Sequence, residues 1–140
     1  MDIDTALRWA AGRRNAVLIT IRSDGRPQSS DIAYVVADGG FVISVTHDRA
    51  KTRNMARDPR VVLHITDPGA WSYVSFDGTV ELSPVTSAPD DETSDRLVDY
   101  YRSVSGGEHP DWDEYRKAMI DEGRLLVRFT PARVVGQING

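Results

Sequence analysis

The chain has 140 residues, the length of one domain, and we expect residues 1–140 to form a single hydrophobic core. Hydrophobic residues make up 40% and charged residues 27%, which excludes a disordered or collagen-like chain, and the net charge of −4 argues against a dedicated nucleic-acid binder. The chain has no cysteine, no secretory signal and no apolar run of ~18 residues, so we expect a cytoplasmic protein without disulfides or a membrane span.

The first part of the chain predicts one helix and then an antiparallel meander. An aspartate cap, an apolar stripe and Gly12 at the end predict a helix over Asp4–Ala11. β-Branched residues and the turn signals Asp24-Gly25 and Asp38-Gly39-Gly40 predict strands over Asn15–Arg22, Gln28–Val36 and Phe41–Val45. A two-turn helix is expected over Ala50–Asp58, ahead of Pro59.

The second part alternates strands with a pair of helices. Strands are predicted over Arg60–Thr66 and Trp71–Ser83, and Asp77-Gly78 within the latter indicates either a hairpin turn or a glycine bulge. After a polar loop, apolar residues at helical spacing predict helices over Asp91–Ser103 and Asp111–Glu122. Two closing strands, Arg124–Thr130 and Ala132–Gln137, are separated by Pro131. Six or seven short strands in this order favour a small antiparallel barrel or sandwich.

A basic segment stands out in this acidic chain. Between His47 and Arg60 there are five cations and two aspartates, and Lys51 is one of only two lysines. Such a run is either a solvated surface or a small anion site. Lys51 between Arg49 and Arg53, with short side chains at a helix start, supplies an ammonium, guanidinium groups and free backbone N–H groups, which suit a phosphate.

Other common chemistries have no sequence support. The three histidines are not at metal-ligand spacing, and His64 is better explained as a packed strand residue, so no metal site is expected. No serine lies in a G-x-S-x-G motif. Neither the dinucleotide fingerprint nor the P-loop occurs. No catalytic acid or base is identified.

The segment R-A-K-T-R-N, followed by D-P-R, resembles a motif of the split β-barrel flavin and deazaflavin oxidoreductases, the pyridoxamine 5′-phosphate oxidase-like superfamily. The S-D-G-R-P-Q-S hairpin, W-S-Y and the late E-H-P-D-W-D-E-Y-R-K-A-M helix extend the resemblance over nearly the whole chain. The chain is most similar to the branch that uses coenzyme F420. The resemblance implies a mainly β fold, a six-stranded antiparallel split β-barrel with flanking helices, which forms a homodimer with cofactor sites at the subunit interface.

The resemblance also assigns residues to the cofactor. The segment Arg49, Ala50, Lys51, Thr52 and Arg53 is expected to hold the cofactor phosphate, and Ser30, Asp31, Ile32 and Ala33 to lie along the ring. Trp71, Ser72 and Tyr73 are expected to close the site from the partner subunit. Relatives often carry Asn and a longer polar residue where this chain has Asp31 and Ala33. Basic residues beyond the phosphate, such as Arg57 or Arg60, would favour the anionic tail of F420.

The function expected from this resemblance is an oxidoreductase that uses reduced F420 as hydride donor to a small unsaturated or planar acceptor. Tyr73, Asp31 or solvent are the candidate proton donors. Three alternatives remain open at this point: an FMN-dependent oxidoreductase on the same barrel, a carrier that binds F420 or a haem-type ligand without turnover, and a structural dimer with a solvated basic loop.

Overall fold

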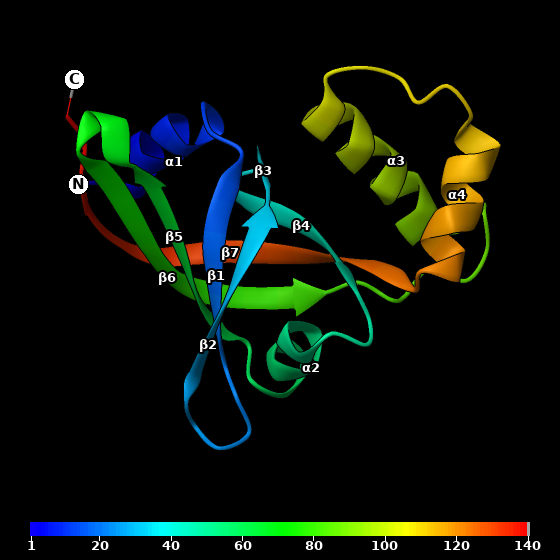
Figure 1. The fold of residues 1–140 in the computed structure, drawn as a ribbon, viewed down its shortest axis with the longest axis horizontal. Helices are drawn as coiled ribbons and strands as arrows, with labels where there is room; N and C mark the ends of the chain where they lie inside the picture. Colours follow the sequence, from blue (N-terminus) through cyan, green and yellow to red (C-terminus); the bar gives the residue numbers. More distant parts are fainter. Residues whose placement is uncertain (140) are drawn as a thin grey trace.

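The computed structural model describes residues 1–139 and contains one antiparallel sheet with strand order β2-β1-β5-β6-β7-β4-β3. The sheet curls into an open barrel, with helices at its ends and on one side (Figure 1). The strands are β1 Asn15–Ile21, β2 Pro27–Ala33, β3 Val35–Ala37, β4 Gly40–Thr46, β5 Arg60–Asp67, β6 Ser72–Leu82 and β7 Arg124–Gln137. The mainly β, antiparallel fold class is therefore confirmed, although the described residues form seven strands and not six.

The seventh strand arises because Tyr34 divides the strand expected over Gln28–Val36. The buried Tyr34 hydroxyl donates to the Ala10 carbonyl (2.6 Å), and its N–H donates to the Arg14 carbonyl (3.1 Å). Before Tyr34, β2 pairs with β1, and after it β3 pairs with β4. The two edge strands of the sheet are thus one residue apart in sequence, which holds the edges together and curls the sheet.

A β-bulge settles the two alternatives for Asp77-Gly78. Strand β6 runs through this pair, and its register with β7 shifts between Asp77 and Gly78. Gly78 faces Pro131, and a Cβ at Gly78 would overlap the Thr130 carbonyl oxygen. Pro131 lies at the irregularity, where the ladder tolerates its missing N–H, so β7 is one continuous strand and the expected break there is wrong.

The barrel interior is filled by aromatic and branched side chains. Phe41 lies at its centre, with ring centroids 5.0 Å from Phe76, 5.8 Å from Phe129 and 5.2 Å from Tyr34. All four side chains are buried. Because β-strand side chains alternate between faces, the same strands present their remaining side chains outward, where the candidate site lies.

The helices are α1 Ile3–Ala11, α2 Ala50–Arg57, α3 Glu92–Ser105 and α4 Trp112–Asp121, with a short 3-10 turn, η1, at Pro68–Ala70. The predicted bounds agree to within two residues. Helices α3 and α4 project to one side of the barrel (Figure 1). Leu97 and Val98 of α3 are buried with Leu126 of β7, outside the main core cluster. No helix among residues 1–139 is both long and apolar enough to cross a membrane.

Candidate functional site

A cavity of about 410 Å³ lies between strand β2, the start of α2 and the helix pair, and we call it the β2–α3 cavity. Its size is within the range of small-molecule sites. One end is cationic and polar, and the other is aromatic. The lining residues are Asp31, Ile32, Ala33, Ser44, Lys51, Tyr100, Tyr101, Val104, Tyr115, Met119 and Arg124. The structure therefore brings three of the expected ring residues together with the lysine of the basic segment.

The cationic end combines two segments that are far apart in sequence. Lys51 comes from α2, and Arg124 begins β7 directly opposite Thr46 of β4. Burial lowers the pKa of Lys51, and the nearby charges of Arg49 and Arg124 lower it further. Like charges held at close range repel one another, and a bound anion would relieve that repulsion.

Two further observations indicate an anion at this end. The Nε atom of Arg124 is buried and has no hydrogen-bond partner among residues 1–139, although its Nη2 donates to Glu122 (3.2 Å). No side chain caps the N-terminus of α2, where Arg49 is the N-cap residue. The first backbone N–H groups of a helix lack intrahelical acceptors and favour negative charge. These donors fit a phosphate group.

The start of α2 is anchored by buried polar side chains. The Thr52 hydroxyl donates to the Thr46 carbonyl at the end of β4 (2.6 Å). The Asn54 amide donates to the Thr20 hydroxyl (3.1 Å) and to Gln28 (3.0 Å). Thr52 therefore positions the helix, and its hydroxyl proton is directed at the protein rather than at the cavity.

Tyrosines form the wall opposite β2. The Tyr100 hydroxyl donates to the Ala33 carbonyl at 3.4 Å, so α3 closes over β2. The Tyr115 hydroxyl donates to the Leu97 carbonyl at 2.9 Å, and burial raises the pKa of Tyr115 to about 12. Burial also raises the pKa of Tyr100. Both phenols are therefore neutral near pH 7 and are hydrogen-bond donors, not bases.

A cluster of four rings stiffens the helix pair behind this wall. Tyr101 of α3 packs against His109, Trp112 and Tyr115, with ring centroids 5.1 to 5.5 Å apart. The other three rings also contact one another at 5.4 to 5.7 Å. Two of the four, Tyr101 and Tyr115, line the β2–α3 cavity. The cluster thus fixes an apolar, flat-sided surface against which a planar ring can pack.

The other expected phosphate residues lie around this end without lining the cavity. Arg49 and Ala50 are exposed at the start of α2. The exposed Arg53 donates to the Asp48 carbonyl at 2.6 Å. Ser30 is half-buried on β2 opposite Leu18 and does not line the cavity.

The W-S-Y segment is not part of the β2–α3 cavity of the same chain. Trp71 follows η1 in a left-handed conformation (φ 54°), so the strand that was expected to begin at Trp71 begins at Ser72 instead. The Trp71 side chain is 84% exposed. Ser72 is buried, and its hydroxyl accepts the Asn139 N–H at 2.8 Å. Tyr73 packs on His64, with centroids 5.7 Å apart.

His64 belongs to a groove on the outer face of the sheet, which we call the outer-sheet groove. Its volume is about 480 Å³, and it runs over β2, β1 and β5. Asp31 and Ala33 line both this groove and the β2–α3 cavity. Strand β2 therefore separates the outer-sheet groove from the β2–α3 cavity. The W-S-Y segment lies next to the groove, because Tyr73 packs on His64.

Sequence reasoning missed Arg124 and the tyrosine wall. Nothing local distinguishes Arg124 from other strand residues, since its approach to Lys51 depends on the pairing of β4 with β7. Arg57 and Arg60, the expected contacts for an anionic tail, lie at the other end of α2. Arg57 donates to the Ile21 carbonyl (3.0 Å), and Arg60 pairs with Asp58 (2.8 Å). Among residues 1–139 no group of three or more metal-ligating side chains is assembled.

The comparisons with known proteins agree with this fold. A solved structure of a conserved hypothetical protein from Mycobacterium tuberculosis is similar with a TM-score of 0.78 at 23% identity, covering 99% of this chain and 85% of that one. An F420 reductase is similar with a TM-score of 0.65 at 22% identity, covering 87% and 89%. The heme storage protein HutZ from Vibrio cholerae is similar with a TM-score of 0.67 at 17% identity, covering 100% and 96%.

At these identities the structural likenesses show the fold alone. The sequence itself identifies the family, because the family model described as pyridoxamine 5′-phosphate oxidase matches residues 4–137, nearly the whole chain. That family consists mainly of oxidoreductases with flavin-type cofactors. The chain belongs to the pyridoxamine 5′-phosphate oxidase family.

Proposed function

We propose that the protein is an oxidoreductase that uses reduced coenzyme F420 as hydride donor to a small unsaturated or planar organic acceptor. The observation that carries the proposal is the meeting of Lys51, the partnerless Nε of Arg124 and the uncapped α2 N-terminus at one end of a cavity with tyrosine walls. The fold similarity to an F420 reductase favours this cofactor within the family.

Different residues of the cavity bind the phosphate and the ring of the cofactor. Lys51, Arg49, Arg124 and the first α2 N–H groups hold the phosphate, and Asp31, Ile32 and Ala33 lie along the ring. When bound, reduced F420 supplies a hydride from its deazaflavin ring. The protein orients the ring against the acceptor and excludes water with its aromatic wall. Proton delivery to the acceptor falls to Asp31, Tyr73 of the partner subunit or solvent.

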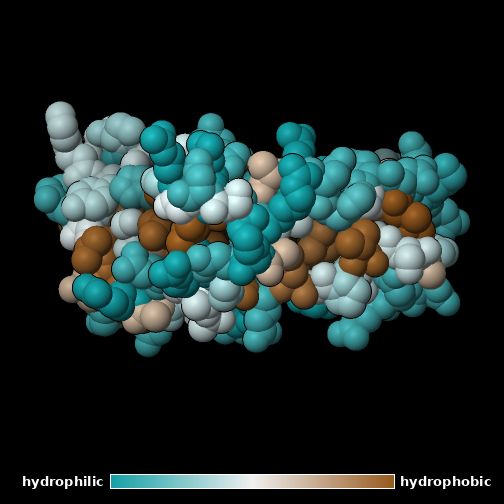
Figure 2. Space-filling model, turned by 90° about the horizontal axis from the view of Figure 1, so that it is seen from below, coloured by the Kyte–Doolittle hydropathy of each residue, from teal (hydrophilic) through white to brown (hydrophobic). Residues whose placement is uncertain are grey.

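The proposal includes a homodimer in which the outer sheet face of each chain covers the other. Val17, Ile19 and Val62 are only half-buried on this face. Figure 2, a view of the molecule from below, shows hydrophobic patches on an otherwise mostly hydrophilic surface. An 84% exposed indole is costly in water, which favours its burial against a partner. Trp71 of one subunit then closes the site of the other.

Two readings of the same cavity compete with this function. FMN also carries a phosphate, and the family binds flavin-type cofactors. The fold is also that of a heme storage protein, so a carrier without turnover is the non-enzymatic alternative.

A reoxidation assay separates the enzyme from the carrier. The protein is loaded with reduced F420, and the return of the oxidised absorbance is followed after addition of menadione or a nitroaromatic acceptor. The proposal expects oxidation faster than for free reduced F420 with the same acceptor. Tight binding with no acceleration by any acceptor would make the protein a carrier.

A further inference from the structure

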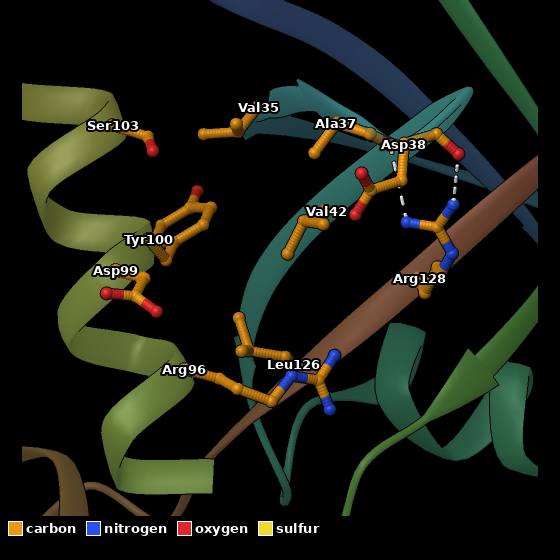
Figure 3. Close-up of a pocket in the computed structure, with 10 residues that line it drawn as sticks. All are labelled: Val35, Ala37, Asp38, Val42, Arg96, Asp99, Tyr100, Ser103, Leu126 and Arg128. Carbon is orange, nitrogen blue, oxygen red and sulfur yellow. Dashed lines mark hydrogen bonds between the residues drawn. The ribbon is translucent and has the colours of Figure 1, made fainter. Parts of the chain in front are cut away.

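A second cavity lies between α3 and the outer faces of β3, β4 and β7, and we call it the β4–α3 cavity (Figure 3). Its volume is about 470 Å³, within the range of small-molecule sites. Its apolar floor includes Val35, Val42 and the fully buried Leu126. The Tyr100 ring separates it from the β2–α3 cavity, because Tyr100 lines both. It contains none of the basic residues assigned to the cofactor.

Arg128 of β7 enters this cavity in a fixed orientation. Its guanidinium donates to the Asp38 carbonyl at 2.6 Å and to the Ala37 carbonyl at 3.3 Å, as Figure 3 shows. Neutral carbonyls hold the group without neutralising its charge. A guanidinium has five N–H groups, so others remain for a ligand.

Arg96 enters from the opposite wall, α3, and extends over Leu126 (Figure 3). The neighbouring arginines of the helix pair are neutralised, Arg102 by Glu108 (2.6 Å) and Arg116 by Asp95 (2.8 Å). Arg96 makes no hydrogen bond or ion pair with any side chain or carbonyl in the part of the chain that the structure describes. Arg96 is half-buried as a residue, and its guanidinium donors are open to a ligand in the cavity.

Two carboxylates also line the cavity, and that of Asp38 is turned toward Val42 (Figure 3). The Asp99 side chain is 76% exposed and approaches Arg102 at 3.5 Å, and Asp38 is exposed. Water screens these charges, whereas Arg96 and Arg128 are partly buried and their charges are screened less. The two exposed carboxylates therefore weaken the attraction of an anion to Arg96 and Arg128 without cancelling it.

We propose that the β4–α3 cavity binds a small organic carboxylate, whose apolar body packs on Val42 and Leu126 and whose carboxylate accepts hydrogen bonds from Arg96 and Arg128. Planar guanidinium groups suit carboxylates because two parallel N–H donors match two oxygens. This site is separate from the proposed cofactor site and does not depend on the identity of the cofactor.

The test uses 2-naphthoate as the probe, with the neutral 2-naphthamide as its matched control. Binding to the full chain is followed by methyl NMR, with the signals of Val42 and Leu126 as reporters. The variant is Arg96→Gln, and Arg133→Gln is the control because Arg133 is exposed on the same strand β7 and does not line the cavity. Lys51→Ala tests whether the probe instead occupies the β2–α3 cavity.

The proposal expects 2-naphthoate to shift the Val42 and Leu126 signals and to bind about tenfold more weakly to R96Q. The affinity of R133Q and of K51A for 2-naphthoate stays unchanged. The unaltered chain binds 2-naphthamide no more tightly than R96Q binds 2-naphthoate. Three results would each overturn the proposal. They are equal affinities for 2-naphthamide and 2-naphthoate, signal shifts confined to residues outside the cavity, and a loss of naphthoate binding in K51A but not in R96Q. The amide comparison uses the unaltered chain, so it decides the question even if R96Q fails to fold.

Discussion

The backbone N–H of His47 donates a hydrogen bond to the Gly123 carbonyl at 2.9 Å. This contact joins the loop before α2, which leads to Lys51, to the turn before β7, which leads to Arg124. Gly123 has a positive φ of 65°, and a Cβ there would overlap the His47 ring. The two halves of the cationic end are therefore held in register by a turn that only glycine fits.

Gly123→Ala is expected to lower the free energy of unfolding by about 1–3 kcal/mol, because the left-handed backbone and the His47 ring both oppose a methyl group. Urea unfolding measures the loss. Gly107→Ala is the control, since a Cβ at Gly107 meets nothing within 4 Å and its change should stay within about 0.5 kcal/mol. Adding His47→Ala to Gly123→Ala should recover part of the loss. Equal stabilities of the two alanine variants would contradict this account.

The affinity for a phosphate-bearing cofactor is expected to fall at alkaline pH. Burial and the neighbouring Arg49 and Arg124 lower the pKa of Lys51, so its ammonium loses its charge at a lower pH than an ordinary lysine. In Lys51→Arg the cation persists, and the fall should move to higher pH. Calorimetric titrations from pH 7 to 10 measure this. Lys117→Arg, at the chain's other lysine, should titrate like the unaltered protein, and an identical profile for Lys51→Arg would refute the role of Lys51.

Asp91 is expected to stabilise the loop that leads into α3. Burial alone would raise the pKa of Asp91, but N–H donors from Ser87, Ser94 and Ala88 and the Thr86 hydroxyl outweigh it and lower the pKa to about 2. Asp91→Ala should cost about 1–2 kcal/mol at pH 7. Asp90→Ala, at the exposed neighbour, should cost little.

The sign of the pH dependence follows from that lowered pKa. Because the folded protein holds the Asp91 proton less tightly than the unfolded chain, the stabilisation is present above about pH 4 and is lost as the pH falls toward 2. Melting temperatures at pH 7, 4 and 2 should show the gap between Asp91→Ala and the unaltered protein closing on acidification. A gap that persists at pH 2 would mean that packing, not the carboxylate charge, is responsible.

Trp71→Ala is expected to weaken cofactor binding by about 2–10-fold, since stacked aromatic contacts contribute roughly 0.5–1.5 kcal/mol. In the proposed homodimer, the variant loses a ring that the partner subunit contributes to the site. Val85→Ala, at another exposed apolar side chain, is the control. Light scattering on the unaltered protein should give the mass of a dimer. If Trp71→Ala binds the cofactor as tightly as the unaltered protein, the W-S-Y segment is not part of the cofactor site.

The sequence predicted the strands and helices well where the local signals are strong. Asp2 caps α1 by accepting the Thr5 N–H (2.7 Å), as an aspartate cap predicts, and the expected strands lie in the barrel. The break at Tyr34 was not predictable, because it depends on a hydrogen bond to Ala10 in a different element. The continuity of β7 through Pro131 likewise depends on the bulge opposite Gly78.

The candidate site was predictable only where its residues belong to local motifs. Lys51 and the strand Asp31–Ala33 carry motif signals, and the cavity brings them together. Arg124 and Tyr100 carry none, because strand register and the docking of α3 bring them into the site. Long-range pairing of this kind leaves no local pattern.

The central claim is that the cationic end around Lys51 holds the phosphate of F420. Calorimetric titration with F420 and with FMN, on the unaltered protein and on Lys51→Ala and Lys117→Ala, tests it most directly. The account predicts tighter binding of F420 than of FMN, a loss of about tenfold or more for Lys51→Ala, and no change for Lys117→Ala. Tighter binding of FMN would assign the protein a flavin, and binding of neither, or unchanged F420 affinity in Lys51→Ala, would contradict the claim.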